Sequence, residues 1–158
     1  MNTLNDFAAL LEKTLIPVAA SAALDAAAAA IEREAKQEIG TYQRSDMGPY
    51  EPWQELAQST KADRVAQGYT ENDPLLRSGE LRDSIDRETH GLEAVVGSDS
   101  DVMVWQEFGT RTIPPRPVLG LAAVRKHEEV LKIVGDGVMA ELVGKWFGVN
   151  FSSKPKIE

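Results

Sequence analysis

The sequence contains no cysteine among its 158 residues. Without thiols it offers neither a disulfide framework nor a thiolate metal site nor a cysteine nucleophile. Histidine is scarce as well, because His90 and His127 are the only two and neither has a His-x-x-x-His or His-Glu-x-x-His partner. We therefore expect no metal site, and we expect both histidines on the surface.

Long apolar runs are missing too. No stretch approaches the roughly 18 consecutive apolar residues of a membrane-spanning helix. Residues 1–13 carry acidic and amide side chains where a signal peptide carries positive charge. We expect neither export nor membrane insertion.

Common enzyme motifs are also absent. The chain has no glycine-rich phosphate loop and no Gly-x-Ser-x-Gly elbow. One carboxylate cluster lacks the calcium-loop pattern and is mixed with arginines, which is typical of a solvated surface of alternating charge. The cluster consists of Glu80, Asp83, Asp86 and Glu88 with Arg77, Arg82 and Arg87. We therefore predict no catalytic residues and no cofactor, and a small hydrolase built from long-range pairs is the enzymatic alternative.

The charge is acidic and unevenly distributed. A formal net charge of −8 disfavours a protein that binds nucleic acid by neutralising phosphates. Residues 1–110 hold 9 Lys/Arg against 20 Asp/Glu, a net charge of −11, whereas residues 111–158 hold 8 against 5, a net charge of +3. An acidic body and a basic C-terminal third can attract copies of the same chain. The alternative is an ordinary scatter of solvated charge.

The N-terminal third is predicted to be helical. Leu4, Phe7, Leu11 and Leu15 recur at helical spacing. Pro17 then kinks this helix or starts the next. An alanine-rich helix should run from Val18 to Ile39 and end at Gly40. Its small side chains would let a neighbouring helix or subunit approach closely, unless they merely favour a helix with one face to solvent.

The middle of the chain alternates loops with short elements. After a loop over residues 41–52, Trp53, Leu56 and Ala57 suggest a helical turn that fixes the loop to the core. The polar residues 60–74 suggest a mobile connection. A short helix is expected over residues 78–85, with Leu81 and Ile85 inward.

A β-hairpin should follow, with strands 84–89 and 92–97 around His90-Gly91. Leu92, Ala94 and Val96 would share one face of its second strand. Residues 102–108 fit either a strand or two helical turns.

The C-terminal part begins with an extended, proline-rich segment over residues 113–117. A long helix should run from Val118 to Trp146, with a kink or break at Gly135-Asp136-Gly137. Its apolar stripe is predicted to comprise Val124, Leu131, Val134, Val138, Leu142 and Trp146. We predict one domain over residues 1–147 and a flexible tail over residues 148–158.

Three segments, in order, carry a family pattern. They are WQELAQST at 53–60, LLRSGELRDSI at 75–85 and WQEFGTRTIPPRPVL at 105–119. This pattern resembles the virion morphogenesis proteins of tailed phages, including the Mu-like family and the related neck or tail-completion family of long-tailed phages. The likeness covers roughly residues 50–125. The sequence departs from the pattern at Val118, where an aromatic residue is common, and at Val104, near which a tyrosine is frequent.

The resemblance implies an α+β subunit in which N-terminal helices and a long C-terminal helix pack on a small antiparallel β-sheet. It implies a virion protein at the head–tail junction, assembled in the host cytoplasm. This protein would form a ring, expected to be a hexamer, and would work without turnover. The implied partners are further copies of the chain, a head-closure or connector protein, and a tail-terminator or tail-tube protein. An adaptor or chaperone of tail assembly, absent from the finished particle, is the alternative.

The resemblance also places a subunit or partner interface in its most specific segment. There Gly109 permits unusual backbone geometry, and the stiff prolines lose little entropy on docking. Arg111 and Arg116 would pair with acidic patches on the next subunit, unless Phe108 and the prolines pack the loop onto its own core. The predicted interface residues are Glu107, Phe108, Gly109, Thr110, Arg111, Pro114, Pro115, Arg116 and Pro117.

The acidic balance of residues 1–110 suggests one more feature of such a ring. An acidic lumen would repel phosphates, so that duplex DNA passes through it without specific binding. This hypothesis fails if the acidic side chains face outward or into subunit contacts.

Overall fold

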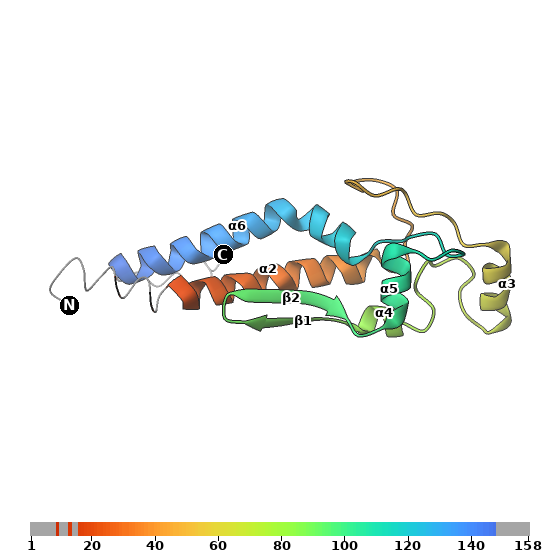
Figure 1. The fold of residues 1–158 in the computed structure, drawn as a ribbon, viewed down its shortest axis with the longest axis horizontal. Coiled ribbons are helices and arrows are strands. Elements are labelled where there is room, and N and C mark those ends of the chain that lie inside the picture. The colour runs from red at the N-terminus through yellow and green to blue at the C-terminus, as the bar shows by residue number, and fades with distance from the viewer. Residues whose placement is uncertain (1–8, 10–12, 14–15, 148–158) are drawn as a thin grey trace, which may run out of the picture.

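The computed structural model describes residues 9, 13 and 16–147 of the chain. The helix predicted over residues 4–15 and the tail predicted over residues 148–158 lie outside the described residues. Figure 1 shows three layers along the long axis, with helix α2 (Ile16–Glu38) between helix α6 (Leu119–Phe147) and a β-hairpin. The predicted α+β fold of helices with a small antiparallel sheet is confirmed.

Helix α2 is the central layer, and its many alanines allow it to pack against a layer on each side. It ends two residues before Gly40, which has a φ of +100°, as the sequence predicted. Small side chains let the backbones of both neighbouring layers approach closely, so the close packing expected of this helix is confirmed. Its buried alanines are Ala19, Ala23, Ala27, Ala28, Ala30 and Ala35.

Helix α6 runs without a break through Gly135 and Gly137, so of the two predicted alternatives the break is wrong and the kink stays a prediction. Tertiary packing accounts for one of these glycines. A Cβ atom added to Gly137 would lie 2.8 Å from the Cβ atom of Ala23, so the missing side chain allows α6 to approach α2. A Cβ atom on Gly135 would meet no atom within 4 Å.

The predicted apolar stripe of α6 is partly wrong. Val124 and Leu131 are exposed, whereas Val134 and Val138 are half-buried as expected. The inward face begins instead at Leu121 and Ala122, both fully buried, and it includes two cations, Arg125 and Lys126, that pair with α2. A hydrophobicity pattern misses such a face because half of it is polar. The side chains of Leu142 and Trp146 lie outside the described part of the chain.

The hairpin pairs β1 (Ile85–His90) with β2 (Glu93–Ser98) in an antiparallel register from Ile85 opposite Ser98 to His90 opposite Glu93. Gly91 has a φ of +60° in the turn, as predicted. Ala94 and Val96 are half-buried, but Leu92 lies in the turn and is exposed, so its predicted place on the shared face is wrong.

The predicted structure of residues 53–74 needs correction. No helical turn forms at residues 53–57, although Trp53 is buried in the core as expected, and helix α3 (Gln58–Ala66) starts later. The stretch expected to be a mobile connection contains most of α3 and a buried cation, Arg64. Its Nε atom donates to the main-chain oxygen of Thr70 at 2.7 Å, which fixes the following loop. A buried arginine of this kind cannot be distinguished from a solvated one in the sequence.

Two short helices complete the fold. Helix α4 (Glu80–Asp83) lies within the predicted range, and Leu81 and Ile85 are directed inward as expected. Residues 102–108, left open between helix and strand, belong to helix α5 (Asp101–Phe108). The core where these elements meet α2 and α6 contains Ala35, Ile39, Met47, Trp53, Ile85, Met103, Val118, Leu121 and Ala122. Among the described residues, no helix is both long and apolar enough to span a membrane.

Candidate interaction site at the connection between α5 and α6

The connection from α5 to α6 begins with a glycine that no other residue can replace without strain. Gly109 has a φ of +72°, in the region that favours glycine. A Cβ atom at this position would lie 2.9 Å from the main-chain oxygen of Ile113 and 3.0 Å from the nitrogen of Pro115. The chain can therefore turn back closely on itself directly after α5.

Thr110 closes this turn. Its N–H donates to the main-chain oxygen of Ile113 at 2.9 Å. Its Oγ1 accepts hydrogen bonds from the N–H groups of Thr112 at 3.3 Å and Ile113 at 3.1 Å. The loop is thus held by its own hydrogen bonds.

Glu107 joins the end of α5 to the start of α6. Its Oε2 accepts from the N–H groups of Val118 at 2.7 Å and Leu119 at 3.0 Å. Its Oε1 accepts from the N–H of Gly120 at 2.8 Å. These N–H groups have no partner within the helix, and the N-terminus of a helix carries partial positive charge, so a carboxylate is well suited to cap it.

Arg116 holds the far end of the loop inside the protein. The residue is 4% exposed, and its main-chain N–H donates to the main-chain oxygen of Gln106 at 2.6 Å. Its Nη2 donates to the main-chain oxygen of Gln54 at 2.9 Å. Burial lowers the pKa of its guanidinium from the ordinary value. Arg116 is therefore held by main-chain oxygens of its own chain, and the pairing predicted for it with an acidic patch on another subunit stays a prediction.

The remaining predicted residues of this segment divide between interior and surface. Pro117 is buried and Pro114 is half-buried, so these two prolines pack against the chain's own core. Pro115 and Arg111 are exposed. The pairing predicted for Arg111 stays a prediction.

Three apolar side chains of α5 project away from the core. Val104 is 54% exposed, Trp105 is 49% exposed and Phe108 is 78% exposed. We call this surface the α5 ridge. The alternative that Phe108 packs the loop onto its own core is therefore wrong, and exposed aromatic side chains of this kind are enriched in protein–protein interfaces.

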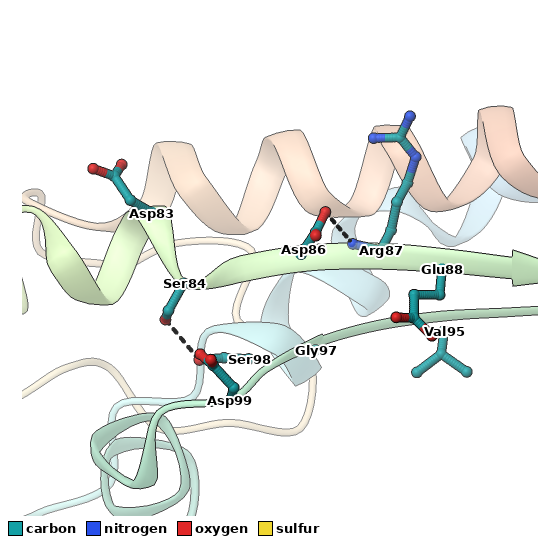
Figure 2. Close-up of a pocket in the computed structure, with 9 residues that line it drawn as sticks. All are labelled: Asp83, Ser84, Asp86, Arg87, Glu88, Val95, Gly97, Ser98 and Asp99. Atoms are coloured by element: carbon teal, nitrogen blue, oxygen red, sulfur yellow. Dashed lines mark hydrogen bonds between the residues drawn. The ribbon is translucent and has the colours of Figure 1, made fainter.

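A groove of about 460 Å³ beside the hairpin contains part of the predicted carboxylate cluster. Figure 2 shows the hydroxyls of Ser84 and Ser98 facing one another, with their oxygens 2.7 Å apart. The side chain of Arg87 turns toward α2 instead, where its Nε lies 3.2 Å from Asp25. The four carboxylates of the cluster are exposed, which confirms the predicted surface of alternating charge.

No histidine lies beside the two serines of this groove. The serine hydroxyls contact each other rather than a base, and both histidines of the chain are exposed and lie outside the groove. Among residues 9, 13 and 16–147, no group of three His, Cys, Asp or Glu side chains is placed to hold a metal ion.

A polar network between α2 and α6 was missed by the sequence reasoning. Arg125 Nη1 lies 3.1 Å from Glu38 Oε1 and donates to Gln43 Oε1 at 2.8 Å. The side chain of Glu38 is fully buried, and its Oε2 has no hydrogen-bond partner among the described residues. Burial raises the pKa of Glu38 to about 8, although the nearby charge of Arg125 lowers it.

Glu38 and Arg125 are 87 positions apart in the sequence. A glutamate near the end of a predicted helix reads as a surface residue, and no local pattern marks its distant partner. Comparisons with protein-family models, curated proteins and solved structures give no match to this chain. The geometry of the described residues and the resemblance in the sequence are therefore the observations that bear on function.

Proposed function

We propose that this chain is a non-catalytic structural protein of a tailed phage that assembles into a ring at the head–tail junction. It would complete the tail or connect it to the head. The observation that carries this proposal is that most of the residues named in segment 107–117 fix the segment to its own chain, whereas an aromatic side chain faces outward. Glu107, Gly109, Thr110 and Arg116 fix the segment to its own chain, while Phe108 is directed outward.

This arrangement suits an interface that forms once and then persists. A segment already held by hydrogen bonds loses little conformational entropy when a partner docks. The outward aromatic side chain supplies apolar area at the cost of only two side-chain torsions. Binding energy is therefore not consumed in ordering the loop.

The proposed partners are further copies of the chain in a ring, with six as the expected number. On its two faces the ring would meet a head-closure or connector protein and a tail-terminator or tail-tube protein. Duplex DNA would pass through the lumen without specific binding. The net charge of −11 over residues 1–110 supports this last point, because a surface of like charge repels phosphates.

The test uses particles produced without this chain, together with a mass-spectrometric search for it in intact wild-type particles. We expect the wild-type particles to contain the protein. Without it, electron microscopy should show filled heads and separate or abnormally ended tails. Normally joined particles would refute the structural role.

Complementation with Phe108→Ala should restore joined particles poorly. Leu92→Ala, which truncates an exposed apolar residue in the hairpin turn, should restore them fully. If the deletion gives defective particles but wild-type particles lack the protein, the chain acts as an assembly adaptor and the proposal fails.

A further inference from the structure

A hollow of about 360 Å³ lies between α3, α4 and α5. Part of its wall is apolar and comes from Leu56, Leu75 and Val102. The rest is polar and includes Arg64 and Arg116. The described chain therefore has a concave surface beside the same helix that carries the exposed α5 ridge.

Two of the three arginines that line the hollow carry charge that no described carboxylate neutralises, whereas the third, Arg77, pairs with Asp63. Arg64 and Arg116 are each 4% exposed, and both donate mainly to main-chain oxygens. Within the described ranges, neither guanidinium has a carboxylate within 4 Å. A buried charge without a counter-charge favours an anionic partner.

Another polar atom beside the hollow lacks a partner. Gln106 lines the hollow, and its Oε1 is buried without a hydrogen-bond partner in the part of the chain that the structure describes. A group that enters here would meet this acceptor together with three arginines and one carboxylate, that of Glu80.

Val104 and Phe108 of the α5 ridge lie on the other side of the same helix, whereas Trp105 is only about 60° around the axis from Val102. At about 100° per residue, Val104 and Phe108 are about 200° to 240° around the axis from Val102, which faces the hollow. Asp101 precedes Val104 by three residues and so lies near the same face. It is exposed and has no cation within 4 Å among residues 9, 13 and 16–147.

We propose that the α5 ridge of one copy docks into the hollow of the next copy. The ring of Phe108 would enter the apolar part, and Asp101 would approach the side that contains the two buried arginines. The two surfaces are complementary in shape, since one projects and the other is concave, and in charge. This inference rests on the proposed function, because it names the contact that would build the ring.

The placement of the two surfaces explains why a ring would form rather than a pair. A twofold dimer uses the same surface on both partners, whereas a ridge and a hollow are different surfaces. A head-to-tail contact leaves one ridge and one hollow unoccupied at the ends of every open chain. Further copies then add in one direction until the ring closes.

Directed cross-linking tests this contact, because the chain has no cysteine of its own. Val104→Cys places a thiol on the ridge and leaves Phe108 and Asp101 unchanged, and Thr60→Cys places one at an exposed position that lines the hollow. After mild oxidation, a mixture of the two single variants should give a covalent dimer. The double variant should give a ladder of products that ends at the size of the ring. Each single variant alone should stay monomeric on a non-reducing gel.

The matched control replaces Val104→Cys with Leu92→Cys, which places a thiol in the exposed hairpin turn. Mixed with Thr60→Cys, it should give no dimer. Efficient self-linking of Val104→Cys would indicate a twofold contact and overturn the proposal, as would the absence of any cross-link between ridge and hollow. If native mass spectrometry still shows a ring in that case, the proposed function stands and only this contact is wrong.

Discussion

Glu107 links two helices through one carboxylate. It is the seventh residue of α5, and it accepts hydrogen bonds from three consecutive main-chain N–H groups at the start of α6. Gly120 leaves space for this contact, because a Cβ atom there would lie 2.8 Å from Glu107 Oε1. Glu107, which was predicted as an interface residue, therefore holds the ends of α5 and α6 together on either side of the predicted interface segment.

Glu107→Ala should lower the free energy of unfolding by about 1–2 kcal/mol, since it removes a helix cap and leaves three N–H groups without their acceptor. Urea unfolding measures this loss. Glu128→Ala, which removes an exposed carboxylate further along α6, is the control and should change stability by less than about 0.5 kcal/mol. Equal losses in the two variants would contradict the capping role.

Glu38 is the residue that should make stability depend on pH. Its folded-state pKa of about 8 lies above the ordinary value of 4.5, so the folded protein keeps a proton that the unfolded chain releases. The contribution of Glu38 to the free energy of unfolding is then fully present below about pH 4.5, and it is lost as pH rises to about 8.

Glu38→Gln should flatten the dependence of stability on pH across this window, because an amide does not titrate. Urea midpoints at pH 5, 6, 7 and 8 provide the measurement. Glu51→Gln, in an exposed loop position, should keep the slope of the original chain. A Glu38→Gln slope as steep as that control would show that another group is responsible.

At the scale of elements, the contact between α2 and α6 depends on side chains that are small or absent. Ala23 on α2 faces Gly137 on α6, and the two backbones approach closely at this point. The same helix α2 contacts the hairpin through Arg87, which reaches Asp25 at 3.2 Å and also pairs with Glu32. Helix α2 thus contacts α6 through close packing and ion pairs, and it contacts the hairpin through the ion pairs of Arg87.

Two glycines of α6 give a matched pair of substitutions. Gly135→Ala should stabilise the protein by about 0.5–1 kcal/mol, because alanine favours a helix and the added Cβ meets no atom within 4 Å. Gly137→Ala should destabilise it by about 1 kcal/mol or more, because the added Cβ collides with Ala23. Thermal unfolding of both variants checks the difference in sign, and stabilisation by both would show that α6 can move away from α2 without cost.

At the scale of the whole molecule, part of the charge asymmetry is used within the chain. Lys126 on α6 lies 3.4 Å from Glu34 on α2, and Arg125 lies 3.1 Å from Glu38. These cations of the basic C-terminal third are therefore engaged with the acidic body of their own subunit. Attraction between copies has to rely on other groups, among which Asp101 and Arg111 are exposed.

Phe108→Ala should separate folding from assembly. The side chain is 78% exposed, so its truncation removes little buried area and should leave the thermal midpoint unchanged. Self-association, followed by analytical ultracentrifugation, should weaken at least tenfold, as expected for an aromatic residue at the centre of an interface. Trp53→Ala is the contrasting variant, because it truncates a core residue and should lower the midpoint. Unchanged association of Phe108→Ala would exclude the ridge from the interface.

Local chemistry determined much of this fold from the sequence alone. The alanine-rich helix, its end before Gly40, the hairpin around Gly91 and the helix that follows the prolines depend on backbone preferences and on periodicity over a few residues. The resemblance to the phage proteins, rather than these local patterns, indicated the segment after α5 as the most distinctive part of the chain.

Only the tertiary structure decided what the residues of that segment do. Arg116 became internal because it meets main-chain oxygens of residues 62 positions away, and Glu107 became a cap because α6 returns to the end of α5. Arg64 is likewise buried although its neighbours in the sequence are polar. Burial depends on contacts between distant parts of the chain, and a sequence pattern registers only near neighbours. The sequence therefore located the segment, and the packing selected Phe108 as the residue that faces outward.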